Sequence, residues 1–145
     1  MNQSARAFQA ARRAAIRAPH RPAVTLEDVE AAFGPRCGEA RSVSAEVPLR
    51  RVVGTLARAE DFDRELRPTR SHVAQRWHSV HRAHTQSQHL GCVSLLQTGD
   101  FYLIVDGHHR ASVARAADQL TIDACVQEVC THRPACLACL PEDAE

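Results

Sequence analysis

The stretch Phe-Tyr-Leu-Ile-Val-Asp-Gly-His-His-Arg-Ala-Ser-Val-Ala-Arg-Ala-Ala, at residues 101–117, decides the fold of this chain. Its first five residues are apolar and favour a strand, whereas the residues after Asp106-Gly107 favour a helix. A strand that passes through a glycine turn into a helix leaves backbone N–H groups open at the positive end of the helix dipole. Because such a helix start binds phosphate or another anion, we predict an anion site at this turn.

The side chains of this turn suit the predicted site. Gly107 lets the backbone approach a ligand closely, and Arg110 is placed to fork onto phosphate oxygens. His108 and His109 offer further N–H donors, and Asp106 could contact a metal ion or a hydroxyl group beside the phosphate. The prediction requires helix-start amides without protein caps and an arginine that makes no internal pair. The alternative is a plain strand-to-helix turn, in which Asp106 caps the helix and solvent surrounds the histidines.

The composition bounds the class of protein. A chain of 145 residues is long enough for one domain with a real core. It has no apolar run near the roughly 18 residues that cross a membrane and no secretory signal, so we expect a cytoplasmic protein with no membrane contact. The net charge of +1 gives the whole molecule no electrostatic footprint for nucleic acid. All 18 residues counted as lysine or arginine are arginines, which excludes mechanisms that need a lysine.

The N-terminal segment is rich in arginine. Residues 1–21 hold five arginines and no acidic residue. On a helix, one face would carry Arg6, Arg13 and Arg17, and Phe8 would lie on the opposite, apolar face. This basic face could touch nucleic acid, an anionic membrane or an acidic partner. The favoured alternative is a terminal helix with a solvated polar face.

Residues 1–45 as a whole are predicted to form this helical arm and a linker. Thr25, followed by Asp28 three residues later, predicts the N-terminus of a short helix over residues 25–33. Small and polar residues at 36–45 predict an irregular connection.

Residues 46–129 are predicted to form the compact domain, a small mixed β-sheet with packed helices of the α/β (α+β) class. A tight turn at Gln97–Asp100 predicts a hairpin between two apolar runs. The expected strands are Cys92–Leu96, Phe101–Val105 and Ile122–Val129.

Two helices are predicted within this domain, over residues 70–84 and 108–118. The first should bury Val73, Trp77 and Val80, and the second should turn Val113, Ala117 and Leu120 to the sheet. Four histidines, at 72, 78, 81 and 84, lie on the first of these predicted helices. A solvated face is the favoured interpretation of this series, ahead of a metal-binding stripe.

Residues 58–68 are dense in alternating charge. One carboxylate here could accept a proton from a hydroxyl nucleophile or hold Mg²⁺ against phosphates, with Asp63 as the first candidate and Glu65 as the second. The favoured alternative is a charged surface turn whose acids pair with Arg58, Arg64 and Arg67 and add little stability.

The run Val105-Asp106-Gly107-His108-His109-Arg110, with the alanine-rich helix and the strand after it, resembles the ParB/sulfiredoxin superfamily over residues 46–129. The resemblance implies a shared strand–Gly-x-x-Arg–helix site for nucleotide phosphates. The stretch from Val53 to Arg64 is also similar to stand-alone bacterial ParB-like proteins of unassigned role. Sulfiredoxins carry their catalytic cysteine two residues before the arginine, where this chain has His108, so sulfinic-acid reduction is not expected.

The resemblance and the residues together predict a nucleotide-binding or phosphate-binding domain of regulatory role. The expected ligand is a nucleoside di- or triphosphate, with or without Mg²⁺, at Gly107, His108, His109 and Arg110. Superfamily members with a similar loop are free-serine kinases, so the first alternative is an enzyme: a kinase that transfers phosphate from ATP or ADP to a small hydroxyl compound, or a nucleotide hydrolase. Its base would be an acid from residues 60–65. The second alternative is a DNA-associated accessory protein that acts through the basic arm.

Six cysteines are many for this length, and without a secretion signal we expect reduced thiols. Residues 130–145 form a cysteine-rich tail. Cys130, His132, Cys136 and Cys139 are soft ligands that could close a tetrahedral zinc site, although their spacing is unusual. A short disordered tail with incidental thiols is the favoured alternative.

Overall fold

This computed structural model describes residues 2–19 and 21–140, so Met1, His20 and the last five residues of the tail lie outside it. The described part holds a five-stranded sheet, four α-helices and three short 3-10 turns. The helices are α1 Gln3–Arg17, α2 Leu26–Phe33, α3 Ala74–Thr85 and α4 His108–Ala116. The strands are β1 Arg36–Pro48, β2 Val52–Thr55, β3 Val93–Thr98, β4 Phe101–Asp106 and β5 Thr121–Thr131. The 3-10 turns are Leu49–Arg51, Ser71–Val73 and Leu137–Cys139.

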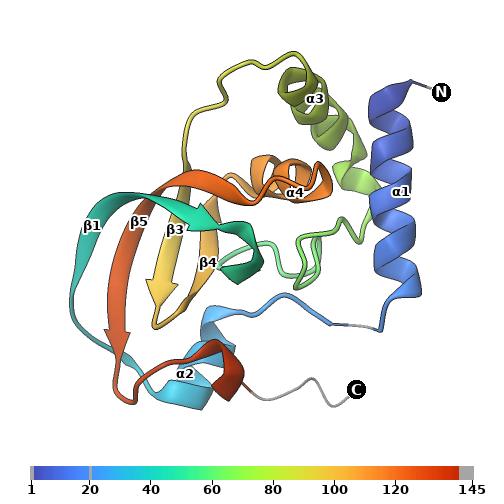
Figure 1. Ribbon diagram of the computed structural model, residues 1–145. Coiled ribbons are helices and arrows are strands. Elements are labelled where there is room, and N and C mark those ends of the chain that lie inside the picture. Colours follow the sequence, from blue (N-terminus) through green and yellow to red (C-terminus); the bar gives the residue numbers. More distant parts are fainter. Residues whose placement is uncertain (1, 20, 141–145) are drawn as a thin grey trace.

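The sheet is mixed, with the strand order β1-β5-β3-β4-β2. Strands β3 and β4 form the predicted antiparallel hairpin, and β5 returns parallel to β3. A parallel neighbour needs a crossover connection, and α4 supplies it between β4 and β5 (Figure 1). The predicted α/β (α+β) class and mixed sheet are therefore confirmed.

The predicted linker at residues 36–45 is wrong, because these residues lie in β1. This strand runs antiparallel to β5, from Arg36 opposite Thr131 to Pro48 opposite Thr121, with a bulge after Cys37. Most of its side chains are exposed on this edge of the sheet. Backbone hydrogen bonds to β5 hold the strand, so its sequence carries none of the apolar alternation by which a strand is recognised.

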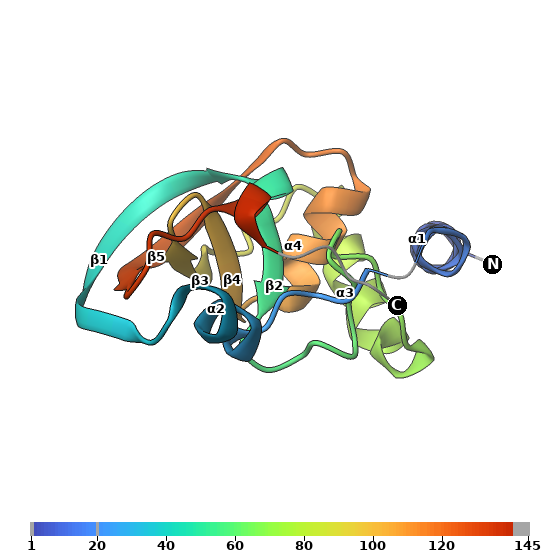
Figure 2. The ribbon, with the colours of Figure 1, turned by 90° about the horizontal axis from the view of Figure 1, so that it is seen from below.

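The two faces of the sheet are covered by different helices. On one face, Ala111 and Ala114 of α4 pack against strand residues that include Leu95 and Val126. On the other face lies α2 (Figure 2). Its residues Val29 and Phe33 belong to the cluster that holds the inner residues of β3 and β4. Both clusters are almost free of solvent, so the sheet is the common core of the domain.

Helix α4 faces the sheet with other residues than predicted. Ala111 and Ala114 contact the strands, whereas Val113 packs with Trp77 of α3. Leu120 is 83% exposed, and Asp118 adopts a positive φ of 60° directly after the helix. The prediction extended the helical periodicity beyond the point where the chain leaves the helix, so it placed the later residues wrongly.

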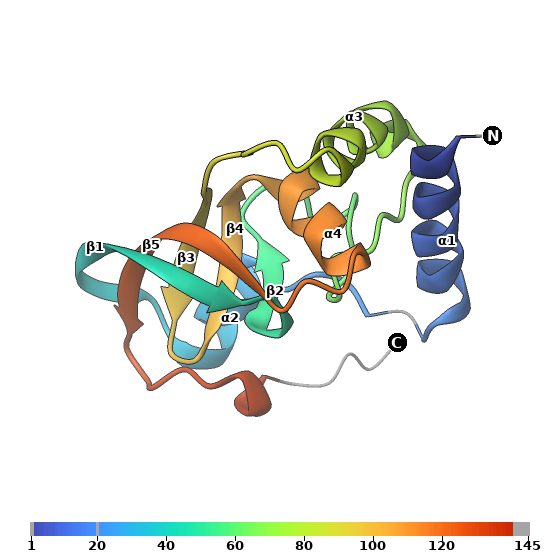
Figure 3. The ribbon, with the colours of Figure 1, turned by 45° about the horizontal axis from the view of Figure 1, so that its top comes forward.

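Helix α1 packs on α3 (Figure 3). The ring of Phe8 meets Trp77 edge-on, with 5.6 Å between the ring centroids. Ser4 Oγ lies 2.8 Å from His81 Nδ1, and the His81 ring stacks on Trp77. Burial lowers the pKa of His81, with smaller contributions from His84 and His78. The predicted solvated histidine face is therefore wrong for His81, which joins the two helices.

Two sequence predictions are confirmed at the N-terminal segment. The Thr25 side chain accepts from Asp28 and caps α2, and Arg6, Arg13 and Arg17 are exposed while Phe8 is buried. In the described part of the chain, no helix has the length and apolar character needed to cross a membrane.

Candidate functional site

The turn between β4 and α4 depends on Gly107. This residue adopts φ 101° and ψ 29°, in the left-handed region that favours glycine. A Cβ atom at this position would lie 2.6 Å from Val93 Cγ1, which is closer than real contacts allow. Two independent reasons therefore require glycine at the point where the strand enters the helix.

The start of α4 is open. No side chain caps it, and the first backbone bond of the helix runs from the Ala111 N–H group to the Gly107 carbonyl, at 3.0 Å. Within the described residues, the N–H groups of His108, His109 and Arg110 have no hydrogen-bond acceptor. Asp106, the cap of the alternative interpretation, is 80% exposed and lies 3.7 Å from Arg110. The first requirement of an anion site is therefore met.

His108 is buried and held as a neutral ring. Its Nε2 atom bonds to the Thr55 hydroxyl, whose oxygen also accepts from the N–H groups of Ala57 and Arg58, each at 3.0 Å. Because a hydroxyl oxygen has two lone pairs, both are occupied and the O–H group must donate to Nε2. We therefore assign the ring proton of His108 to Nδ1. Burial, and then the positive charge of Arg58, lower its pKa to about 4.

His109 shares this environment. Its ring is only 8% exposed and meets the ring of Phe62 edge-on, at 5.5 Å between centroids. Burial lowers its pKa to about 4, and the charges of Arg58 and Arg76 act in the same direction. Both histidines of the turn are therefore neutral at pH 7, in a region of positive potential.

The side chain of Arg110 makes internal pairs, although its Nη2 atom stays beside the turn, 3.7 Å from Asp106. One of its terminal nitrogens, Nη1, donates to the carbonyl oxygens of Leu90 and Cys92, at 2.9 and 3.0 Å. This internal pairing fails the second requirement of the prediction. The side chain instead holds the connection between α3 and β3, and Arg58 is the guanidinium whose charge acts on both histidines.

The two predicted catalytic acids have structural partners. Asp63 is 6% exposed, and its Oδ1 accepts from the N–H groups of Glu65 and Arg67 while its Oδ2 pairs with Arg67 Nε at 2.9 Å. Glu65 lies 3.7 Å from Arg21 and lines a groove with α1 and the C-terminal end of α4. These contacts agree with the alternative in which the acids pair with nearby arginines.

Two acids act on the histidines of the turn. The charge of Asp106 raises the pKa of His108, and the charge of Asp61 raises the pKa of both His108 and His109, against the larger effects of burial and Arg58. The two oxygens of Asp61 lie 3.3 Å from Arg58 and 3.1 Å from His72 Nε2. Sequence reasoning did not single out Asp61, because every position of this charged segment carries the same local signal.

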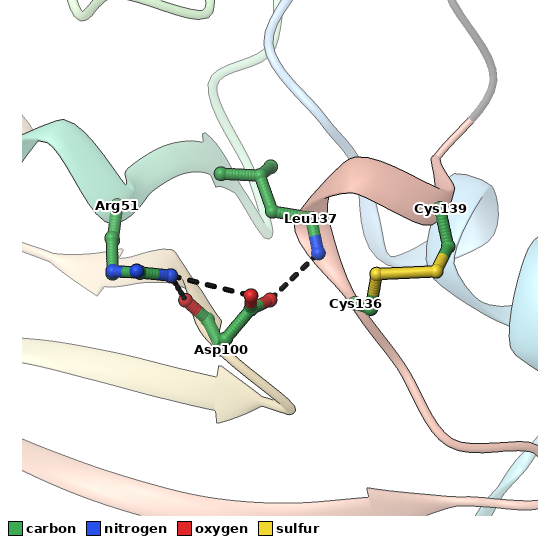
Figure 4. The surroundings of a disulfide bond; sticks show 5 residues. All are labelled: Arg51, Asp100, Cys136, Leu137 and Cys139. Atoms are coloured by element: carbon green, nitrogen blue, oxygen red, sulfur yellow. Dashed lines mark hydrogen bonds and ion pairs between the residues drawn. A yellow bond between two sulfur atoms is a disulfide. The ribbon is translucent and has the colours of Figure 1, made fainter.

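The predicted zinc ligands are not gathered at one point. Cys136 and Cys139 form a disulfide bond (Figure 4), so the expectation of reduced thiols is wrong for this pair. Cys130 lies on β5 opposite Cys37. Among residues 2–19 and 21–140, no group of three or more histidine, cysteine or acidic side chains could hold a metal ion.

The tail is anchored as far as the structure describes it. Asp100, in the β3–β4 turn, accepts from the Leu137 N–H group at 2.6 Å and pairs with Arg51 at 3.3 Å (Figure 4). Leu140 is buried in the cluster beneath α2. The favoured expectation of a disordered tail is therefore wrong for residues 130–140, which pack on the domain.

No family model matches this chain, and no curated protein matches it. Among solved structures, a sulfiredoxin from Arabidopsis thaliana matches over 61% of this chain and 88% of that chain, with 15% identity and a TM-score of 0.43. At this identity a likeness concerns the fold alone.

Proposed function

We propose that this chain binds a phosphate-bearing ligand, a nucleoside di- or triphosphate, at the start of α4. The observation that carries the proposal is the uncapped helix start beside Arg58. The open N–H groups of residues 108–110 and the helix dipole favour an anion there. The Nδ1–H group of His108 and the ring of His109 supply further donors, and Arg58 supplies the opposing charge.

The depressed histidine pKa values support this proposal. The charge of Arg58 disfavours a second positive charge on His108 or His109. A bound anion acts in the opposite direction and raises the pKa of both rings. Since linkage is reciprocal, protonation of these rings strengthens anion binding. The site thus couples ligand affinity to pH, which suits a regulatory role.

Arg110 keeps an indirect part in this proposal. Its backbone N–H group belongs to the open helix start, whereas its side chain holds the carbonyls of Leu90 and Cys92. We therefore expect Arg110 to position the connection before β3 and Arg58 to meet the ligand.

A calorimetric titration tests the proposal with inorganic phosphate, pyrophosphate, ADP and ATP, each with and without Mg²⁺. We expect Arg58→Ala to weaken binding about tenfold, because charged hydrogen bonds contribute about 1.5–3 kcal/mol. Arg50→Ala removes the same charge from an exposed position and should leave the affinity unchanged. Equal affinities of the wild type and Arg58→Ala, or no binding by the wild type, would refute the site.

The same samples test the enzymatic alternative, transfer or hydrolysis of the terminal phosphate. The charge of Asp61 acts on both histidines, so Asp61 is a better candidate for the catalytic base of this alternative than Asp63 or Glu65. Both of its oxygens contact cationic or ring nitrogens, so we expect binding without turnover. Release of phosphate from ATP in the presence of a small hydroxyl compound, lost in Asp61→Asn, would establish the enzyme instead.

The DNA-associated alternative depends on the exposed arginines of α1. Replacement of Arg6, Arg13 and Arg17 by alanine should then abolish salt-sensitive DNA binding and leave phosphate binding intact.

A further inference from the structure

The cysteines of this chain lie in pairs. Cys136 and Cys139 are bonded, and Cys37 faces Cys130 across β1 and β5. The remaining two, Cys92 and Cys125, come from positions 33 residues apart, and their sulfur atoms lie 2.9 Å from each other. This third pair has no part in the proposed phosphate site.

The backbone brings Cys92 and Cys125 together. Cys92 directly precedes β3, and β3 runs parallel to β5 with Ser94 opposite Cys125. A disulfide bond is about 2.0 Å long, so the two sulfur atoms need to approach by only about 0.9 Å. Both side chains are exposed, so the pair is open to small molecules in solution.

A groove gives access to one of the two sulfur atoms. Helix α2 and the tail cover only one end of their face of the sheet, over the cluster that contains Phe101 and Leu103. At the other end lies a groove of about 370 Å³, whose lining includes Ser94, Val105 and Cys125. Val105 is 40% exposed there, although it continues the buried row of β4. A small molecule in this groove would lie against Cys125.

We propose that Cys92 and Cys125 form a redox-active dithiol site, which closes to a disulfide bond by exchange with a low-molecular-weight disulfide. This inference is independent of the proposed phosphate binding.

The exchange proceeds in two steps. The thiolate of one cysteine of the pair attacks one sulfur of the small disulfide, forms a mixed disulfide and releases the first small thiolate. The thiolate of the other cysteine then attacks the bonded protein sulfur, forms the intramolecular bond and releases the second small thiolate. The two protons lost by the cysteines end on the two released thiols. Two protein thiols are oxidised and one small disulfide is reduced, with no further reactant.

Closure of the bond affects the connection between α3 and β3. The carbonyl of Cys92 accepts from Arg110, and that of Leu90 accepts from the same nitrogen. An oxidised pair would therefore tie this connection covalently to β5, in addition to its present bond to α4.

Peptide mapping after treatment with oxidised glutathione tests the proposal. Trypsin places Cys92 in the peptide 83–110, and Cys125 in the peptide 116–145 together with Cys130, Cys136 and Cys139. We expect a linked pair of these peptides, lighter by two hydrogen atoms than their sum, that dithiothreitol separates. The link should be absent in Cys125→Ser and in Cys92→Ser. It should persist in the matched control Cys130→Ser.

Two outcomes would overturn the proposal. One is glutathione retained on Cys92 or Cys125 of the wild type with no linked peptide. The other is a linked peptide that persists in Cys125→Ser, which would assign the partner of Cys92 to another cysteine. Circular dichroism of each variant shows whether it is folded, and the two serine variants at different positions check one another.

Discussion

Two helices of this protein begin in opposite ways. At the start of α2, Thr25 Oγ1 accepts from the Asp28 N–H group at 3.1 Å, and Asp28 Oδ2 accepts from the Thr25 N–H group at 2.9 Å. The first turn of α2 also carries two acidic residues. At the start of α4, Gly107 provides no cap, and the first turn carries two histidines and an arginine.

The difference decides whether the backbone N–H groups at each helix start are free to bind an anion. The reciprocal cap and acidic side chains of α2 satisfy its donors and repel an anion. Helix α4 is stabilised by burial instead, because Ala111 and Ala114 pack on the sheet and Val113 packs on α3. Since packing supplies most of the stability of a helix in a protein, α4 can leave its donors open for a ligand.

Among changes at the two helix starts, Gly107→Ala is expected to have the largest effect on the free energy of unfolding. The new Cβ would overlap Val93 and would be held at a positive φ, so we expect the free energy of unfolding to fall by about 3 kcal/mol. Gly38→Ala is the matched control, because Gly38 has a positive φ of 73° and no atom within 4 Å of an added Cβ. It should cost about 1 kcal/mol. Urea unfolding measures both, and equal losses would show that the overlap with Val93 has no effect.

The two histidines at the start of α4 are expected to make the free energy of unfolding depend on pH, whereas the start of α2 carries no histidine. Their pKa values are lowered to about 4 from 6.5, so the unfolded chain binds more protons between these values. Their contribution to stability is complete above pH 6.5 and is lost as the pH falls toward 4. By pH 5 the loss is about 2 kcal/mol for each histidine.

Urea unfolding from pH 7 to pH 5 measures this loss in the wild type and in His109→Asn. The variant should lose about half as much as the wild type over this range. His89→Asn, at an exposed position, should behave as the wild type does. A wild-type stability that is constant from pH 7 to pH 5 would contradict the prediction.

The smallest effect is expected from removal of the α2 cap. Thr25→Ala deletes the oxygen that accepts from Asp28 and should lower the free energy of unfolding by about 1 kcal/mol. Phosphate affinity should not change, because the cap belongs to the closed helix start. Weaker phosphate binding by this variant, in the titration used for Arg58→Ala, would show that the two helix starts are not independent.

The parts of the fold that sequence predicted are those with strong local signals. Thr25 and Asp28 marked the start of α2, and the apolar run before Gly107 marked β4. Strand β1 was missed because its exposed residues, around Arg41, have no apolar alternation. Its partner β5 lies some eighty residues later in the chain, beyond the reach of any local pattern.

In the candidate site, too, the features with local sequence signals were predicted and those that depend on distant residues were missed. Sequence located the turn at Gly107 and the two histidines, because strand, glycine and helix signals follow one another there. It assigned Arg110 to the ligand, whereas the carbonyls of Leu90 and Cys92, 20 and 18 residues away, bind this side chain. The assignment of Asp63 as a catalytic acid was equally local, since it took no account of which acid would lie beside the histidines.

On its own, the order of amino acids settled the features that neighbouring residues impose on one another. These are the hairpin, the capped start of α2 and the glycine turn into α4, which depend on dihedral angles and contacts within a few residues. The packed chain decided the remainder: the tautomer of His108, the partners of Arg110 and the meeting of Cys92 with Cys125. Each of these depends on groups more than fifteen residues apart, and only the folded chain brings such groups to within bonding distance.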